Sequence, residues 1–126
     1  MTERRQGQSL ATIDKERRIG AALSVGMRIA SSRFAGRGFR YWHFDANAGS
    51  GWNEAVNVPG SPIVFWDVAK LCLSGLEPAA FFCDVDLGAM RRLQLRFNGN
   101  PDAERHSFLL PGDNQARWQH PWGNLR

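Results

Sequence analysis

Apolar residues recur at helical spacing near the start of the chain. Between about Thr12 and Phe34 they fall every three or four positions, at Ile19, Leu23, Met27, Ala30 and Phe34. This period places one apolar stripe along an amphipathic helix. The paired glycines of AGRG, at 35–38, predict the turn that ends this helix.

Three later segments have the composition of buried strands. They are rich in aromatic and aliphatic residues and lie at 40–45, 78–86 and 106–114. Each is short and is followed by small or turn-forming residues, so we expect three strands separated by other elements.

Helical segments separate these strands. The segment 61–75 begins with Ser61 as the expected N-cap and Pro62 at the first helical position, which is typical of a helix start. The segment 87–101 places apolar residues on one face and predicts a further helix that closes in NGNP. The stretch 52–60 is predicted to be a loop.

Strands that alternate with helices indicate right-handed βαβ crossovers and a parallel sheet covered on both faces. The predicted class is therefore α/β, a Rossmann-like parallel sheet with flanking helices, partial and of about three strands. We expect a disordered basic arm at 1–11, one Rossmann-like domain at 12–114 and an irregular tail at 115–126. A three-strand sheet leaves an edge exposed, which favours a fragment, a decayed homologue or a second chain that completes the sheet.

Length and composition indicate which class of protein this chain belongs to. A chain of 126 residues forms one domain, and its mean hydropathy of −0.39 predicts a soluble globular protein. No apolar run approaches the ~20 residues of a membrane span, and the N-terminus lacks the apolar core of a secretory signal. Cys72 and Cys83 lie in apolar surroundings and are expected to be buried thiols of a cytoplasmic protein, with a disulfide between them as the alternative. Two cysteines alone do not make a zinc site.

The charge is concentrated at one end. Residues 1–40 carry nine basic and three acidic residues, a net of +6, whereas residues 41–126 carry seven basic and nine acidic residues, a net of −2. A basic N-terminal region on a near-neutral body can contact the phosphates of a nucleic acid. The alternative is that its arginines form the solvated face of the first helix, at Arg17, Arg18, Arg28 and Arg33.

Acidic residues close all three predicted strands, at Asp45, at Asp84 with Asp86, and at Asp113. The carboxyl ends of parallel strands meet at one edge, where ligands of open sheets bind. Acids gathered there repel one another unless they meet donors, and the hydroxyl and amino groups of a nucleoside would supply them. The turn DANAGSG after the first strand is neither a Walker loop nor a dinucleotide fingerprint.

The stretch HFDANAGSGWN resembles the first motif of class I S-adenosylmethionine-dependent methyltransferases, an acidic residue followed by a glycine-rich turn. The longer pattern YWHFDANAGSG…PGSPIVFWDVAKL…AFFCDVDLGAMRRLQLRF…LLPGD is similar to the three-Cys-motif partner proteins and related phage or plasmid methyltransferase-like proteins. The resemblance covers about residues 14–114 and corresponds to the N-terminal half of such a domain.

The resemblance implies S-adenosylmethionine as the cofactor and gives roles by position. Asp45 would orient the turn and the amino group of the cofactor's methionine, and Asp84 would accept hydrogen bonds from the ribose hydroxyls. Asp113 would lie near the adenine, or it is simply a turn residue. Asp86 would cap the following helix or take part in binding. The residues that let the cofactor approach the backbone would be Ala48, Gly49 and Gly51.

Complete relatives have about seven strands, and the later ones carry the acceptor site, so catalytic residues cannot be named here. His43, between two aromatic residues, is expected to be a packed strand residue rather than a base or a ligand. No metal site is expected. The first hypothesis is an incomplete methyltransferase-like protein, with nucleic acid as the first acceptor to test. Whether it is an enzyme stays open, and the alternative is a non-catalytic nucleotide- or nucleic-acid-binding module with a basic arm.

Overall fold

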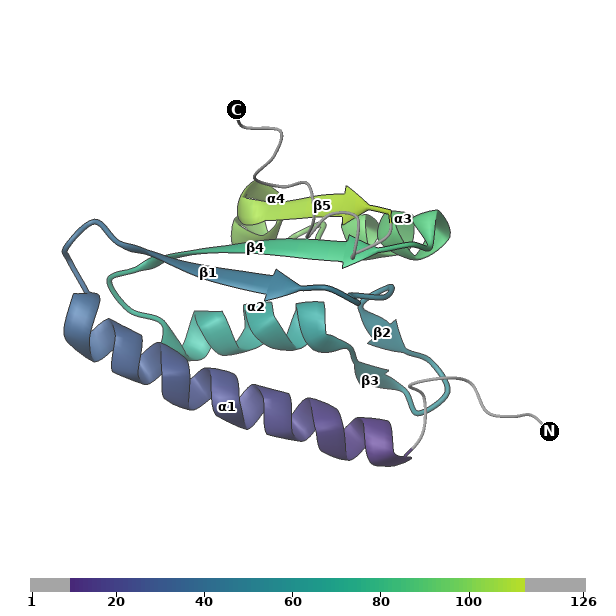
Figure 1. Cartoon of the computed structure of the whole chain (residues 1–126), viewed down its shortest axis with the longest axis horizontal. Helices are drawn as coiled ribbons and strands as arrows, with labels where there is room; N and C mark the ends of the chain where they lie inside the picture. Colours follow the sequence, from purple (N-terminus) through teal and green to yellow (C-terminus); the bar gives the residue numbers. More distant parts are fainter. Residues whose placement is uncertain (1–9, 113–126) are drawn as a thin grey trace.

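The computed structural model describes residues 10–112, apart from the side chains of Leu10 and Thr12. A three-stranded parallel sheet has the order β1-β4-β5 (Figure 1). Its strands are β1 (Arg40–Asp45), β4 (Glu77–Asp84) and β5 (Ser107–Pro111). The predicted α/β class, with about three parallel strands and flanking helices, is confirmed.

Four helices accompany this sheet in the described part of the chain. They are α1 (Leu10–Phe34), α2 (Ser61–Cys72), α3 (Leu87–Arg96) and α4 (Pro101–His106). The expected basic arm therefore ends inside α1, because Leu10 and Ala11 are helical; its first nine residues and the tail at 115–126 lie outside the described residues.

The N-cap of α2 was predicted wrongly. Gly60, in an extended conformation, holds that position, and Ser61 is the first helical residue. The hydroxyl of Ser61 donates to a carboxylate oxygen of Asp45 instead of accepting from the helix.

One hairpin, of two short strands, and one short helix were not predicted. Residues 52–60, expected to be a loop, contain a short antiparallel hairpin of β2 (Trp52–Asn53) and β3 (Val58–Pro59). The sequence NGNP closes α3 but also opens α4, because the side chain of Asn100 accepts from the backbone N–H of Ala103.

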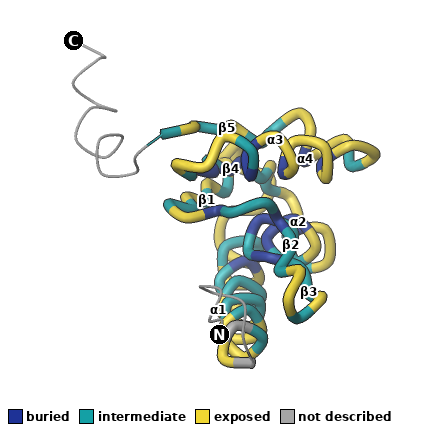
Figure 2. The backbone as a smooth tube through the Cα atoms, turned by 90° about the vertical axis from the view of Figure 1, so that its right-hand side faces the viewer, coloured by how far each residue is buried: buried dark blue, intermediate teal, exposed yellow. Residues whose placement is uncertain are grey.

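The expectation that helices cover both faces of the sheet is wrong for the described residues. Each new strand is added on the same side, from β1 to β4 to β5, so both crossovers run in one direction and leave their helices on one face. Viewed end-on, α2, α3 and α4 lie on one side of the strands (Figure 2). We call the other side the open face; no described helix covers it.

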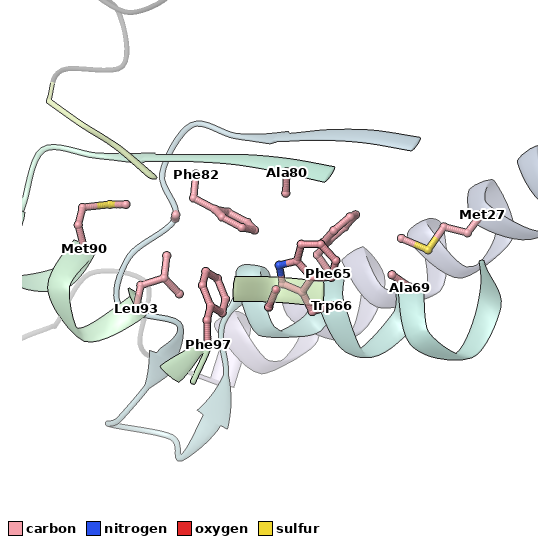
Figure 3. Close-up of a cluster of buried hydrophobic side chains, with 11 residues drawn as sticks. Met27, Phe65, Trp66, Ala69, Ala80, Phe82, Met90, Leu93 and Phe97 are labelled. Carbon is pink, nitrogen blue, oxygen red and sulfur yellow. The ribbon is translucent and has the colours of Figure 1, made fainter. Parts of the chain in front are cut away.

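The core lies between the covered face and the helices. Phe82 projects from β4 toward Phe65 on α2 and toward Leu93 on α3 (Figure 3), and all three are fully buried. The long helix α1 packs on α2 rather than on the sheet, and its Met27 is fully buried. The predicted stripe on α1 is only partly buried, since Phe34 is 42% exposed.

Cys72 and Cys83 are free thiols, and Cys83 is buried while Cys72 is half-buried. Among the residues that the structure describes, no helix has both the length and the apolar character needed to span a membrane.

Candidate functional site

The turn after β1 and the end of β4 lie side by side at the carboxyl edge of the sheet. The backbone N–H of Ala48 donates to the carbonyl oxygen of Cys83 at 3.0 Å. The next N–H, of Gly49, donates to the Oδ2 atom of Asp84 at 2.9 Å. The structure therefore brings together four of the predicted site residues, Asp45, Ala48, Gly49 and Asp84.

The two glycines of this turn serve different purposes. Both have positive φ angles, +68° at Gly49 and +88° at Gly51, which favour glycine. A Cβ atom added at Gly51 would lie 2.8 Å from Cδ1 of the buried Leu93. The absence of a side chain at Gly51 therefore allows α3 to pack closely against the turn. A Cβ atom added at Gly49 would meet nothing within 4 Å. Of the two glycines, therefore, Gly49 is the one with open space beside its backbone.

Asp84 joins the turn to the start of α3. Its Oδ2 accepts from Gly49, and its Oδ1 accepts from the backbone N–H of Asp86 at 2.9 Å. A carboxylate offers about four lone-pair positions. The half-buried Asp84 thus keeps acceptor capacity on both oxygens after these two backbone bonds.

Asp45 is used differently. Its Oδ1 accepts from the backbone N–H of Asn47 at 3.3 Å, and its Oδ2 accepts from the hydroxyl of Ser61 at 2.5 Å. Asp45 therefore ties the turn to the first residue of α2.

Asp86 has a different role from Asp45 and Asp84. Asp86 caps α3, because its side chain accepts from the backbone N–H of Ala89 at 3.1 Å. Asp113 lies outside the described residues.

Arg96, on the last turn of α3, is a site residue that sequence reasoning missed. Its Nε donates to the carbonyl oxygen of Ser50 at 3.1 Å, and its guanidinium lies 5.7 Å from the ring centroid of Trp52. It also forms a 3.6 Å ion pair with the exposed Glu54. No spacing in the sequence connects Arg96 to a turn 46 residues earlier, so only the fold identifies it.

The hairpin also touches α1. The side-chain amide of Asn53 donates to Glu16 at 3.4 Å. Burial raises the pKa of Glu16, and this hydrogen bond and the charge of Lys15 oppose the effect. The first helix thus reaches the residues that follow the turn.

His43 lies on the covered face, away from this edge. Its ring stacks on Phe65 with centroids 4.5 Å apart, and its buried Nε2 has no hydrogen-bond partner among the described residues. Burial lowers the pKa of His43, and the nearby charge of Asp45 partly opposes this. The side chain is a packed strand residue, as predicted.

Two pockets lie away from the turn. One of about 590 Å³ lies between α3, α4 and β5, and one of about 370 Å³ lies between α2 and α4. Neither is lined by Asp45, Gly49 or Asp84. Within residues 10–112, no cluster of three or more His, Cys, Asp or Glu side chains is arranged to hold a metal ion.

Comparison with known proteins gives no family for this chain. No protein-family model matches it, and no curated protein matches its sequence significantly.

Proposed function

We propose that the carboxyl edge of the sheet binds S-adenosylmethionine, as the cofactor-binding part of a methyltransferase-like protein. The observation that carries the proposal is the 2.9 Å hydrogen bond from Gly49 to Asp84. It joins an acidic strand end to a glycine with open space beside it, at the edge where open parallel sheets bind ligands.

The remaining acceptor positions of Asp84 suit the two vicinal hydroxyls of a ribose. Each carboxylate oxygen already accepts one backbone N–H and can accept one further bond. Hydrogen bonds to a charged carboxylate are stronger than those between neutral groups, so a bound diol would gain affinity at this position. The open backbone at Gly49 supports the approach of the rest of the cofactor.

In a complete relative, the cofactor would supply a sulfonium methyl group, and the protein would hold cofactor and acceptor in line and exclude water. Asp45 and Ser61 fix the turn against α2, and Arg96 fixes it against α3. These contacts preorganise a binding surface. The methyl acceptor and a catalytic base stay unassigned.

The test is isothermal titration of the full chain with S-adenosylmethionine and S-adenosylhomocysteine. We expect micromolar binding, weakened about 10- to 150-fold in Asp84→Asn, because charged hydrogen bonds contribute about 1.5–3 kcal/mol. Asp102→Asn, at the start of α4 near the opposite edge, is the matched control and should bind like the original chain. Absence of binding by a chain with a cooperative unfolding transition would overturn the proposal.

A second candidate function is nucleic-acid binding through α1. Its four arginines, Arg17, Arg18, Arg28 and Arg33, are all exposed, and Arg18 forms an ion pair with Asp14 at 2.7 Å. Fluorescence anisotropy with a labelled duplex should then give an affinity that falls steeply with salt. Replacing Arg17, Arg28 and Arg33 by glutamine should reduce that slope; an unchanged slope would remove this candidate.

A further inference from the structure

A cavity of about 590 Å³ lies between α3, α4 and β5, and we call it the lateral cavity. One wall comes from α3 and the residue after it, because Met90, Gln94 and Phe97 recur at the spacing of one helix face. Residues of α4 and β5 form the other walls. Sites for small molecules have volumes of about 300–1,000 Å³, so the lateral cavity has the size of such a site.

The inner wall of the lateral cavity is apolar. Met90 and Phe97 line it, and both are almost fully buried members of the core (Figure 3). Leu109 of β5 also lines it and packs against the same core. A ligand with an apolar body would remove this wall from water, which is favourable for binding.

Two opposite charges also line the lateral cavity. They are Arg91 on α3 and Glu104 on α4, and both residues are exposed. Neither side chain forms an ion pair with the other or with any other residue between 10 and 112. Each charge is therefore available to a group of opposite sign on a ligand.

The hydroxyl of Ser107 adds a hydrogen-bond donor. The indole Nε1 of Trp66 donates to Oγ of Ser107 at 2.9 Å, which fixes the position of this oxygen. A hydroxyl that accepts a hydrogen bond still has its own hydrogen to donate. Because Ser107 lines the lateral cavity, its hydroxyl can donate to a carbonyl or carboxylate oxygen of a ligand.

The balance of charge decides which class of ligand fits. The residues that line the lateral cavity include one basic and one acidic side chain, so their net charge is zero. A phosphate with two negative charges would meet a single arginine and would be repelled by Glu104. A fatty acid would leave Glu104 without a partner, and a simple amine would leave Arg91 without one. A zwitterion with an apolar body suits both charges and the apolar wall.

We propose that the lateral cavity binds an apolar amino acid or a short apolar peptide with free termini. The carboxylate lies at Arg91, the ammonium group lies at Glu104, and the apolar side chain covers Met90 and Phe97. The hydroxyl of Ser107 donates to an oxygen of the ligand. This site is separate from the turn after β1, because Asp45, Gly49 and Asp84 do not line the lateral cavity.

Titration of the ¹⁵N-labelled full chain with L-phenylalanine and with L-leucyl-L-phenylalanine, followed by amide chemical shifts, tests the proposal. We expect saturable shifts in α3, α4 and β5 but not in residues 46–51, with a Kd of ~0.1–1 mM for at least one ligand. The ligand with the lower Kd shows whether the cavity prefers an amino acid or a peptide.

Derivatives of the better ligand separate the two charges. N-acetylation removes the ammonium group and amidation removes the carboxylate, and each should raise the Kd about 2- to 5-fold, since exposed ion pairs contribute little. In Arg91→Gln the effect of amidation should disappear while that of acetylation stays, and in Glu104→Gln the reverse should hold. Arg92→Gln is the matched control, because Arg92 is an exposed neighbour on α3 that does not line the cavity.

Arg91 and Glu104 are both exposed, so their variants are expected to fold. The absence of saturable shifts in α3, α4 and β5 of the original chain would overturn the proposal, whatever fills the cavity instead. Binding that neither acetylation nor amidation weakens would overturn it too. So would acetylation and amidation effects that persist unchanged in both Arg91→Gln and Glu104→Gln.

Discussion

Gly51 and Gly49 lie two residues apart in one turn, yet a methyl group added at each meets different surroundings. At Gly51 it would press on the buried Leu93, and at Gly49 it would enter open space. Both positions have positive φ angles, so both substitutions strain the backbone. Only the first also overpacks the core.

Gly49→Ala should therefore lower the free energy of unfolding by about 1–2 kcal/mol, the cost of a left-handed residue. Gly51→Ala should lower it by about 2–5 kcal/mol, because overpacking adds about 1–3 kcal/mol. Urea denaturation of the two variants measures the difference. Equal losses would mean that α3 moves away from the turn without cost.

His43 makes stability depend on pH. Burial lowers the pKa of His43 in the folded chain, so between this pKa and the unfolded value near 6.5 the unfolded state binds more protons. The free energy of unfolding should therefore be largest above about pH 6.5 and fall as the pH drops below it. The slope is limited to about 1.4 kcal/mol per pH unit and is smaller because the ring is partly solvated.

Urea denaturation of the original chain and of His43→Phe, at pH 7.5 and pH 5.5, tests this. The difference in unfolding free energy between the two chains should change with pH in favour of the phenylalanine variant at pH 5.5. Carboxylates titrate in both chains, so they cancel in the comparison. Parallel pH profiles would show that His43 accepts a proton in the folded chain as readily as in the unfolded one.

At the scale of elements, the β2–β3 hairpin depends on contacts outside itself. A two-residue ladder is marginal alone. Arg96 binds the carbonyl oxygen of Ser50 next to it and lies against Trp52. The hairpin is therefore expected to be held by α3 more than by its own hydrogen bonds.

Arg96→Met removes the guanidinium but keeps an apolar stem. Amide hydrogen exchange in residues 52–59 should then become at least several-fold faster, while exchange in β4 stays unchanged. Glu54→Gln is the control and should have little effect, since its ion pair with Arg96 is exposed. Equal exchange in Arg96→Met and the original chain would show that the hairpin is stable by itself.

Elements with strong local signals could be predicted from the sequence. The strand at 40–45 matches β1 at both ends, and the helical period near the N-terminus predicted α1 to within about two residues. The hairpin and α4 could not be predicted in the same way. The hairpin contacts an arginine that is distant in the sequence, and α4 is only six residues long, too short to show a period.

For the whole molecule, one core joins the sheet to all the packed helices. Met27 of α1 belongs to the same buried cluster as Phe65 and Phe82, although α1 packs on α2. Such a small domain should unfold in a single cooperative transition. Trp66, almost fully buried in the cluster, is a suitable reporter.

Met27→Ala should lower the free energy of unfolding by about 2–5 kcal/mol, because a large buried side chain is lost. The urea transitions followed by tryptophan fluorescence and by far-ultraviolet circular dichroism should coincide, both before and after the substitution. Two separate transitions would mean that α1 unfolds independently of the sheet.

The sequence predicts which strand ends lie together better than it predicts the contacts within the turn. Acidic strand ends and the glycine turn predicted that Asp45, Gly49 and Asp84 would meet, because parallel strands bring their carboxyl ends to one edge. That Gly51 accommodates Leu93 could not be read from the turn alone. The prediction that helices cover both faces of the sheet was wrong because the alternation of strands and helices does not reveal on which side of the sheet each new strand is added.

The strand order also bears on how the chain assembles during synthesis. In the described parallel sheet, each new strand is placed beside the previous strand of that sheet, and none has to be inserted between two strands that are already paired. Domains begin to fold from the N-terminus while translation continues, at about 5–20 residues per second. The pair of β1 and β4 can therefore form before β5 is made, and it then serves as the template on which β5 docks.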